Sequence, residues 1–203
     1  MKKIILAVAM VITGAYSMNV AAQTKTSLGV KLNGTLTDVR LTDLQGANTS
    51  FRAGGAFGGF VKIEFSENFA LQPELMFNYT EAKVNYLGER NRYKYASVGI
   101  PVYAVGQFKV GNGKMYLGAG PSIGYGFSID SDTEKLPEGH PDENKLELDH
   151  WNMGGGAMIG YEFRNGIQIN AGYQMSFDLR SSSKVKGSEV KTHTISLGVG
   201  YRF

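Results

Sequence analysis

Apolar and polar residues alternate with a period of two through most of the chain. In the last twelve residues, Thr192 to Phe203, every second position carries an aliphatic, aromatic or histidine side chain, and the positions between them carry Thr, Ser, Gly or Arg. A period of two places these two sets on opposite faces of an extended strand. The segment is therefore predicted to be an amphipathic β-strand.

The same alternation recurs seven more times, and no stretch after the first 22 residues shows a clear helical period. The chain has 27 glycines, 11 tyrosines and 11 phenylalanines but only 5 prolines, which favours strands. In the segment 93–108 apolar residues fall on both faces, so we expect a β-bulge near Pro101. The eight expected strands cover approximately residues 27–39, 51–65, 69–83, 93–108, 114–129, 148–163, 167–181 and 192–203.

Short and long connections alternate strictly between these strands. Tight hairpin turns are predicted at residues 66–68, 111–113 and 164–166, and the last two contain an Asn-Gly pair that tolerates positive φ. This alternation is typical of an all-β, eight-stranded antiparallel up-and-down barrel, in which the last strand closes against the first. The longer polar links lie near residues 40–50, 84–92, 130–147 and 182–191.

The first 22 residues have the pattern of a secretory signal peptide. Lys2 and Lys3 precede an apolar run from Ile4 to Ile12, and the small residues Val20-Ala21-Ala22 stand before Gln23. The apolar run is too short to span a membrane as a helix. We therefore expect a signal peptide at 1–22 and one barrel domain at 23–203. The chain has no cysteine, which excludes disulfides and thiolate metal sites.

The apolar face is expected to face lipid. The strands carry roughly forty apolar residues on that face, which would overfill the interior of an eight-stranded barrel. Ten residues of strand, tilted by roughly 45°, span ~23 Å, close to the ~25 Å of a lipid-facing band. We therefore predict a transmembrane barrel of the outer membrane. Its expected interfacial aromatic residues are Phe69, Tyr79, Trp151, Tyr161, Tyr201 and Phe203.

The opposite face carries glycines, amides and charged residues, and is expected to line the lumen. We interpret its charges as a paired network that closes the barrel, and a narrow proton or ion path is the alternative. Counting from the turn at 66–68 predicts that Lys62 lies diagonally opposite Glu74. The expected lumen network comprises Lys31, Arg52, Lys62, Glu64, Glu74, Glu162, Asp178 and Arg180.

Four segments resemble a known family: GVKLNG from Gly29, FALQPELMFNY from Phe69, SVGIPVY from Ser97 and GAGPSIGYG from Gly118. They are similar to the PorT-like group of outer-membrane β-barrel proteins common in Bacteroidetes, which are small barrels of the OmpA/OmpX type. The resemblance spans essentially the whole chain after the signal peptide. It implies the fold and the location, but no catalytic residue, because members of the group differ in function. At the position before the Ile-Pro pair, many members have Glu, whereas this chain has Gly99. A role of that glutamate therefore does not carry over to this chain.

The expected partners follow from this location. The barrel surface is expected to contact outer-membrane lipid and lipopolysaccharide. The outer-membrane assembly machinery would recognise the C-terminal aromatic strand, and the external links would bind a protein. Removal of Lys2 and Lys3 leaves the charge close to neutral, so we expect no nucleic acid partner. We also expect no cofactor, no metal and no catalytic residue.

Three other functions are kept as alternatives. A lipid-modifying enzyme would use His150 or His193 near the outer rim, but no motif places a nucleophile beside either base. A conduit for small hydrophobic molecules and a secretion accessory protein are the other two.

The acidic segment 130–147 contains His140 but lacks the EF-hand spacing of a calcium loop.

Overall fold

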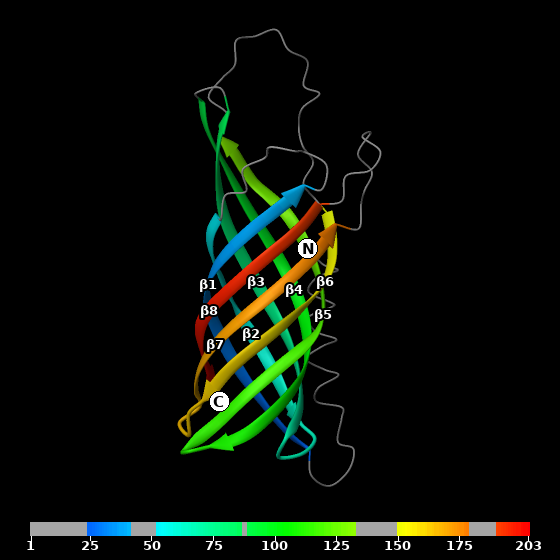
Figure 1. Cartoon of the computed structure of the whole chain (residues 1–203), viewed down its shortest axis with the longest axis vertical. Coiled ribbons are helices and arrows are strands. Elements are labelled where there is room, and N and C mark those ends of the chain that lie inside the picture. The colour runs from blue at the N-terminus through cyan, green and yellow to red at the C-terminus, as the bar shows by residue number, and fades with distance from the viewer. Residues whose placement is uncertain (1–23, 42–51, 87–88, 133–149, 179–189) are drawn as a thin grey trace.

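The chain folds into a closed β-barrel. The structure, a computed structural model, describes residues 24–41, 52–86, 89–132, 150–178 and 190–203. Each strand pairs with its two neighbours in chain order, and β1 pairs with β8 (Figure 1). The expected eight-stranded antiparallel fold is confirmed. The strands are β1 Lys25–Leu41, β2 Arg52–Glu64, β3 Phe69–Tyr86, β4 Glu89–Val110, β5 Gly113–Asp132, β6 His150–Glu162, β7 Ile167–Asp178 and β8 Val190–Arg202.

The seam between β1 and β8 closes the sheet. Its register runs without interruption from Gly29 opposite Arg202 to Leu41 opposite Val190. Beyond β8, the amide of Phe203 donates a hydrogen bond to the carbonyl of Leu28 (2.9 Å). The predicted pairing of the last strand with the first is confirmed, and it removes both edges of the sheet.

Among the described residues, no helix is long and apolar enough to cross a membrane.

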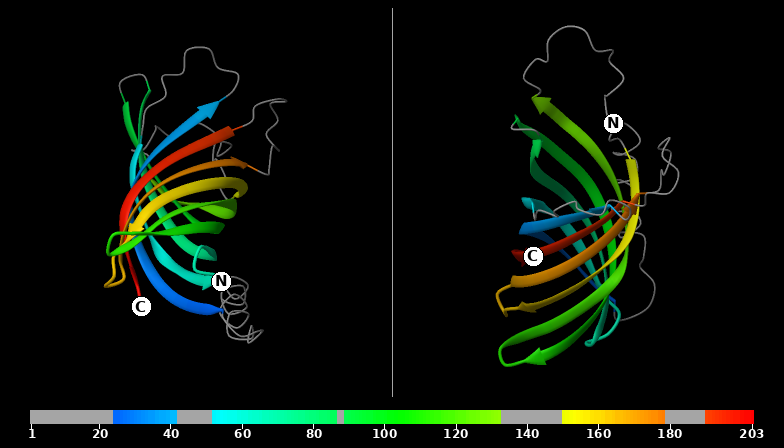
Figure 2. Two further views of the ribbon diagram at one scale, coloured as in Figure 1. Left: turned by 60° about the horizontal axis from the view of Figure 1, so that its bottom comes forward. Right: turned by 45° about the horizontal axis from the view of Figure 1, so that its top comes forward.

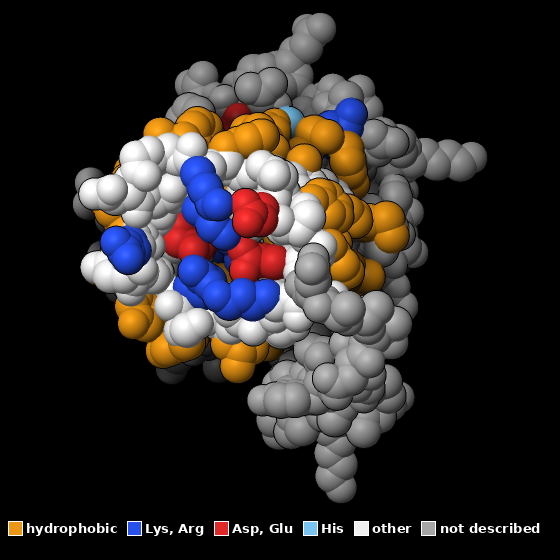
Figure 3. Space-filling model, turned by 90° about the horizontal axis from the view of Figure 1, so that it is seen from below, with side chains coloured by type: hydrophobic (Ala, Val, Ile, Leu, Met, Phe, Trp, Pro, Cys, Tyr) orange, Lys and Arg blue, Asp and Glu red, His pale blue; other side chains and the backbone are white. Residues whose placement is uncertain are grey.

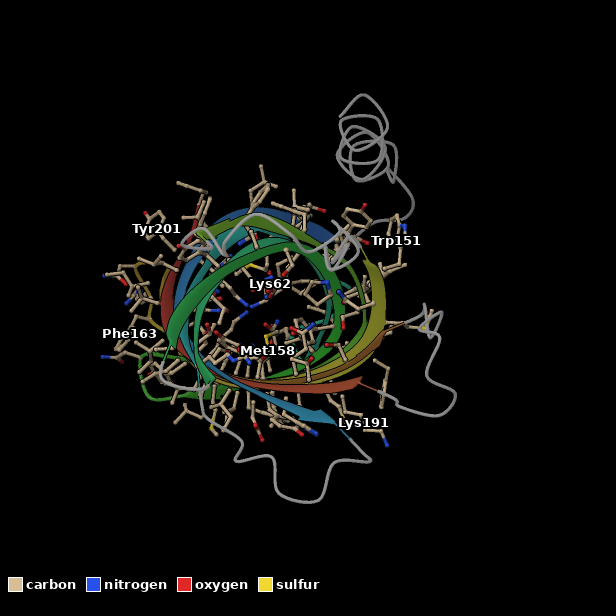
Figure 4. The ribbon with its side chains drawn as sticks, turned by 90° about the horizontal axis from the view of Figure 1, so that it is seen from above. Lys62, Trp151, Met158, Phe163, Lys191 and Tyr201 are labelled. Atoms are coloured by element: carbon tan, nitrogen blue, oxygen red, sulfur yellow. The ribbon has the colours of Figure 1, made fainter. Side chains whose placement is uncertain are left out.

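Side chains alternate between an apolar outer surface and a polar lumen. On β1, Leu32 is 61% exposed on the outside, whereas the adjacent Lys31 is 5% exposed. Seen along the barrel axis, Trp151, Phe163 and Tyr201 point away from the barrel, and Lys62 and Met158 point into it (Figure 4). The strands are strongly tilted and wrap around the lumen (Figure 2).

One end of the barrel carries the three tight turns and the ends of β1 and β8, and is called the turn end; the opposite end is called the loop end. At the turn end, the hydroxyl of Ser66 accepts hydrogen bonds from the amides of Asn68 and Phe69 (3.3 and 3.0 Å). Positive φ occurs at Gly166 (86°), as the Asn-Gly pair predicts. In the β4–β5 turn it occurs at Gly111 (59°), one residue before the Asn-Gly pair.

The predicted bulge near Pro101 is wrong. The register of β4 against β5 shifts between Lys94 and Tyr95 instead. From Gly99 onward, odd-numbered residues of β4 point into the lumen without a break, so Tyr103 and Val105 are buried inside the barrel. The two faces of β4 therefore alternate regularly. The apolar residues on its second face line the lumen and do not mark a bulge.

The predicted link at 84–92 is also wrong, because this stretch is mostly paired strand. Val84 lies opposite Asn91, and Tyr86 lies opposite Glu89. Strands β3, β4 and β5 consequently extend past the other strands at the loop end (Figure 1). The other three expected links fall mainly on residues 42–51, 133–149 and 179–189, outside the described part of the chain.

Deletion of Phe203 should lower the amount of folded barrel in the outer membrane severalfold. The deletion removes the last backbone bond of the closing seam and an aromatic ring that packs edge-on against Tyr201 (5.2 Å between centroids). The heat-modifiable gel band of outer-membrane fractions measures this amount, and Phe203→Tyr is the matched control. Wild-type levels of the truncated protein would contradict the role of this residue in assembly.

Candidate functional site

Three glutamates in the lumen are each bound by a lysine and a glutamine. This arrangement recurs three times with different strands contributing, so each buried carboxylate has both a cation and an amide donor. Lys114 (3.0 Å) and Gln107 (2.7 Å) bind Glu64, Lys31 and Gln72 (2.8 Å) bind Glu74, and Lys62 (3.1 Å) and Gln168 (2.8 Å) bind Glu162.

Two of these ion pairs, Lys31–Glu74 and Lys62–Glu162, are almost completely buried, and the third, Lys114–Glu64, is partly buried. The side chains of Lys62 and Glu162 are 1% and 3% exposed, and Arg202 adds a second cation to Glu162 at 2.7 Å. Viewed onto the turn end, basic and acidic side chains gather in the middle of the barrel, with hydrophobic side chains around the outside (Figure 3). Removing one partner from such a pair leaves a buried charge without compensation, which is strongly destabilising.

An apolar cluster packs among the ion pairs. It consists of Ala70, Tyr103, Val105, Tyr116 and Met158, and is called the collar. Tyr116 is 2% exposed, and the ammonium of Lys62 lies 5.7 Å from the centre of its ring. The ammonium of Lys31 lies 3.6 Å from the sulfur of Met158. The collar and the ion pairs together fill the turn-end half of the lumen.

Lumen glycines make room for the collar. A Cβ atom at Gly160 would overlap the ring of Tyr116, and one at Gly118 would lie 2.9 Å from the terminal methyl of Met158. Tyr116 and Met158 can therefore lie over the neighbouring strand, because their paired positions, Gly160 and Gly118, carry no side chain.

A cavity of about 50 Å³ lies above the collar, toward the loop end. Glu74 of the ion pairs and Tyr103 of the collar form part of its wall. Amide and hydroxyl side chains form about half of the rest, and apolar residues form the other half. The side-chain oxygen of Asn33 is buried there without a hydrogen-bond partner. The lining residues are Asn33, Thr35, Ala56, Glu74, Met76, Asn78, Gly99, Pro101, Tyr103, Gly172, Tyr173, Gln174, Thr194 and Ser196.

Of the eight residues expected in the lumen network, the structure places five in ion pairs: Lys31, Lys62, Glu64, Glu74 and Glu162.

The other three residues of that expected set are not placed in an ion pair. Arg52 is partly buried at the loop end of β2 and forms none among the described residues. The side chain of Asp178 and all of Arg180 lie outside the described part of the chain.

The predicted proximity of Lys62 and Glu74 did not yield an ion pair. Lys62 of β2 binds Glu162 of β6, and Glu74 of β3 binds Lys31 of β1. Counting from a hairpin turn considers only neighbouring strands. In a barrel of eight strands, long side chains reach across the lumen to strands that are not neighbours, and the turn gives no information about these partners.

Sequence reasoning missed Lys114, Arg202 and the three glutamines as members of the network. Alternation was the available signal for the two cations: Lys114 has the parity of Tyr116 on β5, and Arg202 has the parity of Gly200 on β8. Both positions therefore face the lumen. No local pattern marks which glutamine binds which carboxylate.

The six expected interfacial aromatic residues lie on the outer surface, in two groups. Tyr79 and Trp151 lie toward the loop end, and Trp151 packs edge-on against Tyr125 (5.3 Å between centroids). The turn-end group comprises Phe69, Tyr161, Tyr201 and Phe203. Tyr161 donates a hydrogen bond to the carbonyl of Val110 (2.8 Å), so its hydroxyl is satisfied at the end of β4.

The histidines do not form a recognisable catalytic or metal site in the described residues. His193 shares a hydrogen bond with the hydroxyl of Tyr173 (2.6 Å) on the outer surface. The side chain of His150 and all of His140 lie outside the described part of the chain. No group of three or more His, Asp or Glu side chains among the described residues has the arrangement of a metal site.

A closed eight-stranded barrel with an apolar exterior and a filled, charged lumen has the architecture of a transmembrane β-barrel. Residues 21–179 match the model of the family described as outer membrane protein beta-barrel domain. The chain belongs to this family and is a protein of the outer membrane. No curated protein sequence matches the chain.

Solved structures of other barrels are similar to the chain at low sequence identity. Neisserial surface protein A has 15% identity and a TM-score of 0.51, with 88% of this chain and 99% of that chain covered. Ail of Yersinia pestis has 18% identity and a TM-score of 0.46, with 90% and 100% covered. OprG of Pseudomonas aeruginosa has 13% identity and a TM-score of 0.47, with 90% and 98% covered. The first of these similarities supports the fold alone.

Replacing Lys31 by Met should destabilise the barrel by about 3–5 kcal/mol, because Glu74 would stay buried with only Gln72 as a partner. The double variant Lys31→Met/Glu74→Gln should recover much of this loss. Urea unfolding in lipid vesicles measures the change. The control is Lys109→Met, which removes an exposed ion pair with Glu67 at the turn end and should change little. Equal effects of Lys31→Met and Lys109→Met would contradict this account of the lumen.

Proposed function

We propose that this protein is a non-conducting outer-membrane barrel whose role is structural or interactive and is carried by its loop end. The observation behind this proposal is the filled lumen. Ion pairs join β1 to β3, β2 to β5 and β2 to β6, so the network crosses the barrel in several directions. An ion on its way through would have to separate these pairs and displace the collar.

The size of the barrel supports the same conclusion. Eight strands enclose an interior just wide enough for side chains to fill. Here the turn-end half contains long lysine, glutamate and tyrosine side chains, several of them almost completely buried. The cavity of about 50 Å³ lies on the loop-end side of the collar. A barrel of this kind does not offer an aqueous pore along its axis for function.

The extension of β3, β4 and β5 is the part of the loop end best suited to bind a protein. β2 begins at Arg52, and its first pair with β3 joins Gly54 to Thr80. From Glu81 to Tyr86, β3 therefore pairs with β4 alone among the described residues. A strand with one unpaired side presents backbone donors and acceptors to an extended segment of another chain.

Within the family, we assign the chain to the PorT-like group on the four sequence segments that resemble it. In the barrel, these segments supply Lys31, Glu74 and Tyr103 to the lumen. A role as a secretion accessory is compatible with an interaction at the loop end. A lipid-modifying enzyme is less well supported, because the described partner of His193 is Tyr173 on the outer surface.

Shortening the β3–β4 hairpin should abolish partner binding without affecting the barrel. In the variant, residues 83–92 are replaced by Asn-Gly, which removes the outermost pairs of β3 and β4 and keeps the pairs below them. Affinity capture from cross-linked intact membranes, followed by mass spectrometry, is expected to recover a partner with the wild-type protein and to lose it with the variant.

The control for this experiment is a double substitution in a hairpin at the opposite end of the barrel, Ser66→Gly/Asn68→Gly, which should leave the captured partner unchanged. Heat-modifiable gel migration shows that each variant has folded. The proposal would be contradicted if the shortened hairpin captured the same partner at the same yield, or if the turn-end variant lost it.

A further inference from the structure

Three prolines on adjacent strands coincide with interruptions in strand pairing. Pro73 lies in β3, Pro101 in β4 and Pro121 in β5. The register of the other five seams is continuous over its described length. The interrupted positions are residues 61–62 opposite 72–73, residues 74–75 opposite 100–101 and residues 102–103 opposite 120–121.

These interruptions lie at one level of the barrel wall. Pro73 is opposite Val102, and the same register places Val102 opposite Pro121. Proline has no amide hydrogen to donate to a neighbouring strand. In most sheets it is therefore confined to edges and bulges, but a closed barrel has no edge. In hydrocarbon no water replaces the missing bond, so this band is the weakest part of the wall.

The β3–β4 interruption separates the cavity from the lipid-facing surface. Glu74 and Met76 of β3, and Gly99 and Pro101 of β4, line the cavity on the inner side. Leu75 and Ile100 have the opposite parity and are partly exposed on the outer surface. A cavity lined by both polar and apolar groups is thus divided from the hydrocarbon by a single layer of wall that lacks two of its strand pairs.

Of the two interruptions involving β4, that between β3 and β4 has more free space on its lumen side. Across the β4–β5 interruption, a Cβ atom at Gly120 would overlap the carbonyl oxygen of Val102, so the two backbones are in close contact. Beside the β3–β4 interruption, a Cβ atom at Gly99 would have its nearest neighbour, the side-chain nitrogen of Asn78, at 3.8 Å. The β3–β4 interruption is therefore the less crowded of these two on its lumen side.

We propose that the β3–β4 seam at Leu75 and Ile100 is a lateral passage, through which small uncharged amphipathic molecules move between the cavity and the membrane. Such a molecule has one hydroxyl or amide group and a small apolar body. The amide and hydroxyl groups of Asn33, Gln174 and Ser196 can bind the polar group in the cavity. A charged molecule is excluded because a charge is costly in hydrocarbon.

The filled half of the lumen explains why the passage is lateral. The ion pair of Lys31 with Glu74 and the collar close the cavity toward the turn end. A molecule that enters the cavity cannot continue along the barrel axis. The interrupted seam beside it leads directly to the apolar part of the membrane, where the amphipathic molecule is soluble. This function does not depend on a protein partner at the loop end.

A disulfide across the seam tests the proposal. The register places Leu75 opposite Ile100, so Leu75→Cys/Ile100→Cys brings two cysteines within bridging distance in a chain that has none of its own. The uptake of 1-naphthol is followed by fluorescence in vesicles whose outer leaflet is lipopolysaccharide. We expect the wild-type protein to accelerate uptake, oxidation of the variant to remove this acceleration, and reduction to restore it.

The matched control is Ile169→Cys/Val199→Cys, which bridges the continuous β7–β8 seam on the same lipid-facing surface. Its oxidation should leave uptake unchanged. Pro101→Val is a second test that needs no disulfide: it restores an amide donor to the seam and should slow uptake in a protein that still shows heat-modifiable migration. The proposal is overturned if wild-type protein does not accelerate uptake, or if neither oxidation across β3–β4 nor Pro101→Val reduces it.

Discussion

Hydrocarbon provides no hydrogen-bond partner for a backbone amide or carbonyl, and the barrel is organised around this constraint. Pairing of β1 with β8 provides hydrogen-bond partners for the backbone groups of the two strands that would otherwise be edges, and the register of that seam is unbroken. Closure also forces alternate side chains outward, where Leu32 and Leu197 meet lipid, and the intervening ones inward. The proline band in β3, β4 and β5 is the exception to full pairing, which is why it is a candidate for function.

The narrow lumen follows from closing only eight strands, and it determines how the inward charges are satisfied. Charges on opposite walls are close enough to bind each other directly, so Lys62 reaches Glu162 across the barrel. A glutamine donates a second hydrogen bond to each of the three lumen glutamates, and the collar occupies the space between the ion pairs. The result is a sealed half and a half with a small cavity. Non-conduction and a lateral outlet are both consequences of this asymmetry.

Strand number, the tight turns, the closing seam and the two faces of most strands could be predicted from sequence, because each depends on alternation or on local turn residues. The partners of the lumen charges could not, since they depend on side chains that cross the barrel, as with Lys31 and Glu74. Tyr103 and Val105 were misleading because an apolar residue in a lumen breaks the pattern that identifies the lumen. The polar sequence of the β3–β4 hairpin predicts a link without strand structure, yet its backbone is paired as far as Tyr86.

The central claim is that the lumen is closed by the ion pairs and the collar. Single-channel recording of the purified protein in planar bilayers tests it most directly, because the current reports any continuous aqueous path through the barrel. The account predicts no stable openings of pore size at any applied voltage that the bilayer tolerates. Reproducible, long-lived openings of pore size from the folded, heat-modifiable protein would contradict it.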